Sequence, residues 1–168
     1  DEIRKAEEKT DHFEDILGSY LVRLSSLQIS EEVSREAAML LMAIGDFERI
    51  SDHSVNILES AEEMNNKNIS SEPGEAEMSV LSSAVEEITQ ISLNAFLAND
   101  VKTATHVEPL EQVIDKLKEK LRANHIKRLQ QKECSIEAGF VWSDLLTNFE
   151  RTADHCSNIA GGIIDNEQ

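Results

Sequence analysis

The amino-acid sequence predicts an all-α protein, an antiparallel helical bundle made of two repeats. Apolar residues recur at intervals of three and four, as in Leu110, Ile114 and Leu117, which places them on one face of a helix. Only 2 prolines and 6 glycines interrupt the 168 residues, and valine and isoleucine do not alternate as they would in strands. A third observation is an internal duplication, because Phe-Glu-Arg-x-x-Asp-His-x-x-Asn-Ile occurs at residues 47–57 and again at 149–159.

Two long helices are expected in the first part of the chain. The first covers about residues 3–27. Ser30 is a suitable N-cap for the second helix, since acidic residues that favour the positive end of the helix dipole follow it directly. The second helix ends near Asn65, where a polar stretch rich in helix breakers begins and continues to Gly74. That stretch predicts a linker.

Two further helices are expected directly after this linker. The third helix covers about residues 75–98, and residues 99–100 turn the chain. The fourth helix ends near Gln131, and Pro109 either kinks it or marks its start.

Ser135 is the expected N-cap of a fifth helix, which ends near residues 161–162 because glycine is common just after a helix. The chain then divides into a first repeat over residues 1–66 with two helices, a linker over 67–74 and a second repeat over 75–168 with three helices. The first helix of repeat one is missing from this chain.

An apolar stripe along residues 13–24 of the first expected helix needs cover. We therefore expect the missing helix, or a substitute for it, to lie upstream in a longer parent protein or to come from a second copy. The chain begins with Asp1 rather than Met, which favours an excised piece of a longer protein.

Charge and composition exclude several classes of partner. The chain has 33 acidic and 16 basic residues, which argues against nucleic acid and anionic membrane surfaces and favours metal ions or a basic protein patch. Its longest apolar run, residues 37–44, is far shorter than the about 20 residues of a membrane-spanning helix, and no signal peptide is visible. Two cysteines without paired spacing favour a reduced, cytosolic setting.

The duplicated segment keeps its charged residues as well as its apolar ones. With Phe47 at the centre of the buried face, Glu48 and Asp52 lie one turn apart on the flank of the helix. Glu150 and Asp154 repeat this arrangement. Two carboxylates at that spacing repel each other unless a cation lies between them. A solvated surface is the usual explanation for such a pair, but the duplication favours a metal site.

Two other carboxylate pairs share this spacing. Glu111 and Asp115 form one, and Glu7 and Asp11 form the other at the corresponding place in the first half. Ligation by oxygen alone suits hard or borderline divalent cations, and clustered carboxylates can bridge several ions. The sequence therefore predicts that neighbouring helices gather these pairs into metal sites on the outside of the bundle.

Polar neighbours of the carboxylate pairs are candidates for accessory roles. Asn56 and Asn158 continue the acidic stripe and could each add an oxygen ligand. His53 and His155 lie about 100° around the helix from the aspartates. We therefore expect these histidines to face solvent or a neighbouring helix rather than the same ion.

Other residues of the duplicated helices have simpler expected roles. Arg49 and Arg151 are expected to form ion pairs with the adjacent acids, and phosphate binding is the alternative role for their guanidinium groups. Cys156 is expected on the core-facing side as a small packed residue, and Trp142 is expected in the core.

These residues resemble the PhoU family. The segment Phe47–His53 is very close to the signature of that family. The stretch from Glu133 to Ala160, together with residues 107–115, is similar to the C-terminal PhoU-like domain of bacterial Na⁺/phosphate cotransporter family proteins. The likeness covers nearly the whole chain, and it departs from the family pattern at the N-terminus, where the pattern starts partway.

The resemblance implies a six-helix fold of two three-helix repeats, in which Glu/Asp-x-x-x-Asp motifs hold multinuclear clusters of divalent Fe, Zn, Ni or Mn. It also implies a non-enzymatic regulatory domain at the cytoplasmic face of the membrane. Its partners would be the membrane transport domain of the same parent protein and, in a homodimer, a second copy. Carried over residue by residue, the metal ligands are Glu7, Asp11, Glu48, Asp52, Glu111, Asp115, Glu150 and Asp154.

Two rival interpretations are compatible with the same bundle. One is a metal-free interaction domain, either a stand-alone phosphate-regulon regulator or a scaffold. The other is a catalytic di-iron bundle, but that class uses Glu-x-x-His pairs that point into the core, whereas here the acids point outward and His53 follows Glu48 at a longer spacing. No nucleophile–base pair or phosphate-binding glycine loop supports hydrolase chemistry.

Overall fold

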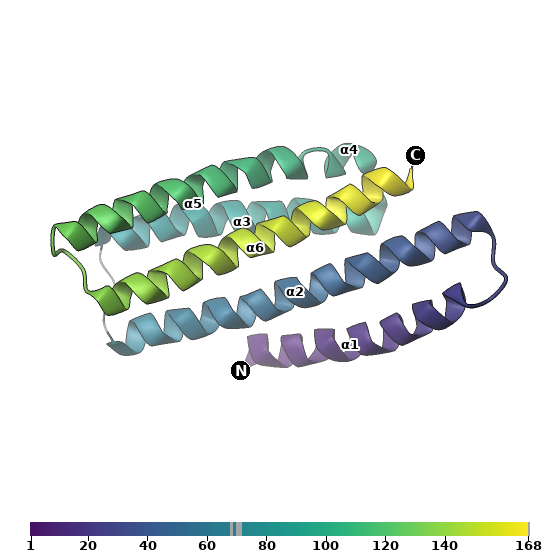
Figure 1. The fold of residues 1–168 in the computed structure, drawn as a ribbon, viewed down its shortest axis with the longest axis horizontal. Helices are drawn as coiled ribbons and strands as arrows, with labels where there is room; N and C mark the ends of the chain where they lie inside the picture. The colour runs from purple at the N-terminus through teal and green to yellow at the C-terminus, as the bar shows by residue number, and fades with distance from the viewer. Residues whose placement is uncertain (68, 70–71, 168) are drawn as a thin grey trace.

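The fold, obtained as a computed structural model, is a layered bundle of long helices (Figure 1). The structure describes residues 1–67, 69 and 72–167, and no strand occurs among them. The all-α prediction is therefore confirmed. The helices are α1 (Glu2–Ser25), α2 (Glu31–Lys67), α3 (Glu72–Ala98), α4 (Val101–Ala104), α5 (Val107–Gln130) and α6 (Ile136–Asn166).

The predicted caps and turns are present. The hydroxyl of Ser30 accepts a hydrogen bond from the backbone N–H of Val33 at 3.3 Å, and that of Ser135 accepts one from Ala138 at 3.1 Å. Asn99 turns the chain with a positive φ of 48°. These local contacts satisfy N–H groups that have no partner within the helix.

Three helix boundaries differ from those expected, at the start of α5, at the start of α3 and at the end of α6. Pro109 lies in the first turn of α5, where its missing N–H costs nothing, and the single expected fourth helix is split into α4 and α5. Helix α3 begins at Glu72, so it takes in part of the stretch expected as linker over residues 67–74. Residues 68, 70 and 71 of that linker lie outside the described residues.

Helix α6 continues to Asn166 and does not end at residues 161–162 as expected. Neither Gly161 nor Gly162 has a positive φ, so neither forms a left-handed cap. A Cβ atom at Gly162 would lie 3.5 Å from the Met39 side chain. That is an ordinary van der Waals distance, so Gly162 lies beside Met39 of α2 at a place where a small side chain would also fit.

The core lies where α3, α5 and α6 pack together. Its fully buried side chains include Leu81, Ile88, Ile114 and Leu146. Trp142 and Cys156 are buried in the same core, as predicted. Burial raises the pKa of the Cys156 thiol to about 11, so this cysteine stays protonated and acts as a small packed side chain.

A buried ion pair joins α3 to the end of α5. Nη2 of Arg128 lies 2.8 Å from Oε2 of Glu77, without hydrogen-bond alignment, while Nδ2 of Asn124 donates to Oε1 of Glu77 at 2.8 Å. The Arg128 guanidinium also lies 5.3 Å from the centroid of the Trp142 ring. These contacts fix the start of α3 against α5 and α6, because breaking a buried pair leaves an uncompensated charge.

The first repeat lacks the cover that the second repeat has. Among the residues that the structure describes, α6 buries 12 residues and its duplicate α2 buries 2. In this part of the chain α1 packs against α2 alone (Figure 1). Of the apolar stripe predicted along residues 13–24, Ile16 and Leu17 are exposed, whereas Leu21 is buried and Leu24 is partly buried, so the expected open stripe is present only in part. None of the described helices is both long and apolar enough to cross a membrane.

Because the second repeat is more deeply buried than the first, matched substitutions in the two repeats should lower the free energy of unfolding by different amounts. Leu146→Ala should destabilise the fold by about 2–5 kcal/mol, because the residue is fully buried and a cavity remains. Ile44→Ala, at the matching place on α2, should cost about 1 kcal/mol, since solvent already reaches that side chain. Urea unfolding measures both values. Equal losses would show that the two halves are equally packed.

Candidate metal-binding site

The two duplicated helices, α2 and α6, meet through an internally symmetric set of polar contacts. Nδ1 of His53 lies 2.8 Å from Oδ1 of Asn148, and Nδ1 of His155 lies 2.8 Å from Oδ1 of Asp46. Because both partners are oxygen acceptors, each Nδ1 carries a proton and donates it. The two imidazole rings stack with their centroids 5.6 Å apart. The histidines therefore face the neighbouring helix.

The two candidate accessory asparagines also take part in this contact. Nδ2 of Asn56 donates to Oδ1 of Asn148 at 3.3 Å, and Nδ2 of Asn158 donates to Oδ1 of Asp46 at 3.2 Å. Their amide nitrogens are thus engaged between α2 and α6 rather than beside the Glu-Asp pairs. Asn148 and Asp46 occupy matching positions before the two copies of the motif, and sequence comparison of the copies alone did not single them out.

The second repeat gathers its acidic residues along the line where α5 meets α6, which we call the α5–α6 seam. Burial raises the pKa of Glu111, and the negative charges of Glu108, Asp154, Asp115 and Glu150 raise it further. The three other predicted ligands of this half therefore all act on Glu111. Carboxylates this close disfavour full ionisation unless a positive charge joins them.

Asp154 and Glu150 show how the seam is partly neutralised. Burial and then the charge of Glu150 raise the pKa of Asp154, whereas the positive charges of His155, Arg151 and Lys118 lower it. Nζ of Lys118 lies 2.7 Å from Oε1 of Glu150, and these side chains are 12% and 19% exposed. An internal ammonium group therefore occupies one side of the seam.

The first repeat has a smaller acidic group on the line where α1 meets α2, the α1–α2 seam. Burial and the charge of Asp52 raise the pKa of Glu48, and Arg49 opposes them with its Nε 3.6 Å from Oε2 of Glu48. The ion pair of Arg49 agrees with the sequence prediction. On α1, the negative charge of Glu14 also raises the pKa of Glu48.

The predicted metal ligands on α1 are Glu7 and Asp11, and Glu14 is not among them. A signal for it exists in the apolar spacing. Phe13 and Leu17 on α1 repeat the spacing of Leu110 and Ile114 on α5, and this alignment puts Glu14 at the place of Glu111. The same alignment puts Gly18 at the place of Asp115, so the α1–α2 seam has fewer carboxylates there. The assignment of Glu7 and Asp11 stays a prediction.

The donor chemistry of the α5–α6 seam fits a hard or borderline divalent cation, because its ligands are carboxylate oxygens. In their present side-chain conformations, however, no three His, Cys, Asp or Glu residues of the described chain converge as they would around an ion. Binding would require the carboxylates to turn toward a common point and Glu150 to release Lys118. The seam is thus a charged surface that a cation would reorganise.

The fold and its seams define a class of protein: a duplicated helical domain with carboxylates along its outer helix contacts and no described helix that could cross a membrane. The sequence matches the PhoU domain over residues 1–61 and 78–163. The chain therefore belongs to the PhoU domain family.

Two relatives show the extent of this likeness. The chain is 27% identical over 125 residues to the phosphate-specific transport system accessory protein PhoU homolog 1 of Thermotoga maritima, which covers 74% of this chain and 53% of that protein. It thus spans about half the length of this relative. The crystal structure of PhoU from Pseudomonas aeruginosa has the same fold, with a TM-score of 0.90 at 22% identity over 99% of this chain and 79% of that chain.

The raised carboxyl pKa values predict how stability depends on pH. A carboxyl group whose pKa is higher in the folded chain than in the unfolded chain binds its proton more tightly when folded. Lowering the pH through that folded pKa therefore stabilises the protein, and raising it destabilises the protein. Glu111→Gln should raise the melting temperature at pH 7, because it removes the buried charge and its repulsion.

The advantage of Glu111→Gln should shrink as the pH falls toward the ordinary carboxyl value of 4.5, where wild-type Glu111 becomes protonated. Melting curves from pH 8 to pH 4.5 measure the difference between the two proteins. Glu108→Gln is a control of opposite sign, since hydrogen bonds from Ser157 and Gln112 lower the pKa of Glu108. A constant gain for Glu111→Gln at every pH would contradict the electrostatic origin of the effect.

Proposed function

We propose that this chain is a regulatory, non-catalytic domain in the control of phosphate transport. Its membership of the PhoU domain family and the name of its Thermotoga maritima relative support this role. Its similarity to the C-terminal domains of Na⁺/phosphate cotransporter family proteins favours a parent protein with a membrane transport domain. The domain would then act on that transport domain from the cytoplasmic side.

The regulatory signal that we propose is the binding of divalent metal at the α5–α6 seam through Glu111, Asp115, Glu150 and Asp154. The observation that carries this proposal is the repulsion that raises the pKa of the partly buried Glu111 and Asp154, which comes from the neighbouring carboxylates of this set. A divalent cation such as Fe, Zn, Ni or Mn would convert that repulsion into attraction, and clustered carboxylates can bridge more than one ion. Glu48 and Asp52 would form a second site with α1.

Lys118 would control access of the ion to the α5–α6 seam. Its ammonium group supplies the positive charge that Glu150 needs while no metal is bound. A metal ion would compete with it for the same oxygen, so the strength of the Lys118–Glu150 pair would set part of the affinity. Release of Lys118 would also change the contact between α5 and α6, because Lys118 and Glu150 lie on different helices.

A metal-free interaction domain is the second candidate function. The lack of three convergent ligands in the described residues and the neutralising Lys118–Glu150 pair favour it. In this case the acidic seams would bind basic groups of a partner protein. Metal titration separates the two candidates.

Glu150→Gln combined with Asp154→Asn should abolish metal binding at the α5–α6 seam, because the ion loses two carboxylate ligands. Lys118→Met should strengthen binding by about tenfold, since it removes a competing charge from a partly buried site. Titration calorimetry with Mn²⁺ and Zn²⁺, together with elemental analysis of protein purified without chelator, measures both effects.

Glu119→Gln is the matched control, because it removes one negative charge from an exposed position of α5. It should leave metal binding unchanged. Binding that is absent in the wild-type protein, or that falls equally in all the acidic variants, would reject the metal site and favour the interaction domain.

The regulatory role has a separate test in cells. Deleting the segment that encodes residues 1–168 from the parent gene should change the response of phosphate uptake to external phosphate, because the transport domain would lose its control. Uptake of radioactive phosphate in starved and replete cells measures this response. Identical uptake with and without the domain in both conditions would remove the proposed link to phosphate.

A further inference from the structure

A cavity of about 340 Å³ lies between α5 and α6, near the turn that joins them. We call it the Trp142 pocket. Its lining is mainly apolar and includes none of the predicted metal ligands, all of which lie among the described residues. A mainly apolar cavity of this size with a few polar groups is typical of a small-molecule site.

Aromatic and aliphatic side chains form the buried floor of this pocket. Trp142 and Leu146 are 5% and 0% exposed, and the imidazole ring of His125 stacks on the indole ring of Trp142 with the centroids 5.5 Å apart. Burial and then the positive charge of Arg128 lower the pKa of His125, so its ring is uncharged near pH 7. The floor is therefore aromatic and uncharged, which favours the ring of an aromatic ligand.

The floor also contains polar atoms that the described chain does not satisfy. Nε2 of His125 and Nε1 of Trp142 are buried and form no hydrogen bond within it. Nε2 of His125 lies against Gly139, 3.2 Å from the place where a Cβ atom would be. Glycine inside a helix is less stable than alanine, so its presence indicates a role in packing or function. Here it keeps the space beside His125 open.

The matching place on α2 lacks these features. Gly139 and Phe140 of α6 are matched on α2 by Ala37 and Ala38, which would narrow the cavity and remove its aromatic rim. The arrangement that the two repeats share therefore does not require this pocket. Ile136 and Phe140 at the rim are nonetheless each 70% exposed. Large apolar side chains gathered at the edge of a cavity are typical of a binding surface.

The charge at the rim is positive. Arg122 is the only charged residue among the described residues that line the pocket, because His125 is neutral. The ion pair of Arg122 with Glu119 is long, at 4.0 Å, and joins side chains that are 46% and 59% exposed. Such a pair contributes little to stability, so the guanidinium group is available to an anion. Its planar donors match a carboxylate.

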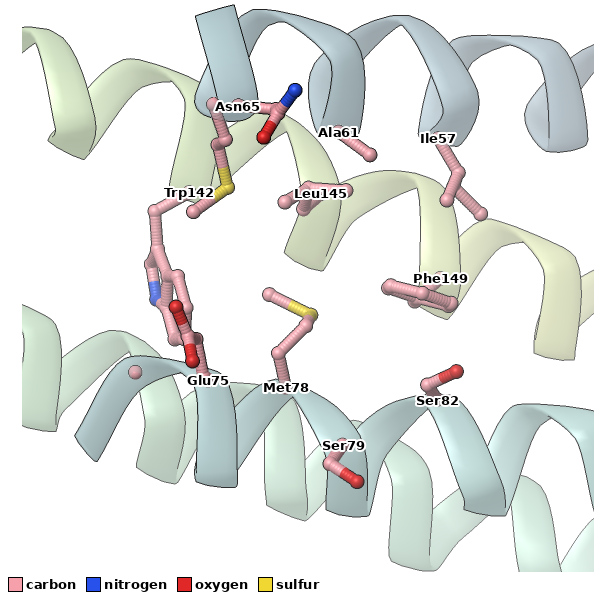
Figure 2. Close-up of a pocket in the computed structure, with 12 residues that line it drawn as sticks. Ile57, Ala61, Asn65, Glu75, Met78, Ser79, Ser82, Trp142, Leu145 and Phe149 are labelled. Carbon is pink, nitrogen blue, oxygen red and sulfur yellow. The ribbon is translucent and has the colours of Figure 1, made fainter. Parts of the chain in front are cut away.

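A second hollow that Trp142 also lines has the opposite charge. This hollow, of about 480 Å³, is bounded by Ala61 of α2, Met78 of α3 and Leu145 of α6 (Figure 2). Its only charged lining residue in the described part of the chain is Glu75. An anionic ligand is therefore expected in the Trp142 pocket and not in this hollow.

We infer that the Trp142 pocket binds a small aromatic carboxylate, with the ring of the ligand against the buried aromatic floor and its carboxylate paired with Arg122 at the rim. The pocket would bind this ligand independently of metal at the α5–α6 seam. A bound ligand would contact α5 and α6 together, because residues of both helices line the pocket.

Trp142 is the only tryptophan of the chain, so its indole is a single reporter within the pocket. The intact chain is titrated with 3-phenylpropanoate, and the indole N–H signal is followed by two-dimensional ¹H–¹⁵N NMR. The expected result is a saturable shift with a Kd of about 1 mM or lower. The uncharged 3-phenylpropanamide should bind about tenfold more weakly, because it cannot form the ion pair.

Two variants test the two parts of the site separately. Arg122→Gln should weaken binding of 3-phenylpropanoate about tenfold and leave binding of the amide unchanged. Phe140→Ala should weaken both ligands, because the apolar rim is lost. Arg35→Gln is the matched control, since it removes one positive charge from an exposed position of α2 and should change neither ligand. Circular dichroism verifies that the variants are folded, which is expected because all three side chains are exposed.

Four outcomes would overturn the inference. The first is no saturable shift of the Trp142 signal up to about 10 mM 3-phenylpropanoate. The second is equal affinity of the wild-type chain for the carboxylate and the amide. The third is binding that Phe140→Ala leaves intact, which would place the ligand in another hollow that Trp142 lines. The fourth is a dimer in sedimentation velocity that Phe140→Ala dissociates, because a second copy would then cover the pocket.

Discussion

The polar contact between α2 and α6 is the constraint on which the rest of the structure depends. His53 donates to Asn148 and His155 donates to Asp46, each across 2.8 Å, and the two rings stack on each other. These groups are partly shielded from water, so a misplaced partner would leave an unmade hydrogen bond at a cost of about 1–3 kcal/mol. The contact therefore fixes the relative rotation of the two helices, and with it the directions in which their other faces point.

Two consequences follow from that rotation. Helix α3 covers the apolar face of α6, whereas the apolar face of α2 is only partly covered, with Phe47 edge-on to Phe96 of α3 at 5.1 Å between ring centroids. The carboxylates Glu48 and Asp52 on α2, and Glu150 and Asp154 on α6, turn outward to meet α1 and α5. A single duplicated helix thus provides a core face, a polar face for its duplicate and an acidic flank. Because of the duplication, the two repeats have the same arrangement of helices. They differ in burial because α3 covers the helices of the second repeat.

Two opposing electrostatic effects act at the acidic flanks: repulsion between carboxylates and attraction to nearby positive charges. Burial, and then the charges of neighbouring carboxylates, raise the pKa values of Glu111 and Asp154. Lys118, partly buried beside Glu150, offsets part of this repulsion and joins α5 to α6. Lys118 supplies one positive charge at the seam, and a divalent ion would supply two. Under the proposed function, metal binding and the contact between α5 and α6 would be coupled through Lys118.

The sequence by itself determined the helices, the duplication, the serine caps and the carboxylate pairs, because each depends on residues close together in the chain. It also showed an apolar stripe along residues 13–24 of α1, since the spacing of Ile16, Leu17, Leu21 and Leu24 is a local pattern. Only the tertiary structure decided that α6 continues past Gly162, that Glu14 acts on Glu48 and that Lys118 pairs with Glu150. These features depend on how far one helix is shifted along another. That shift is set by side chains distant in sequence, and helical periodicity within a single segment contains no information about it.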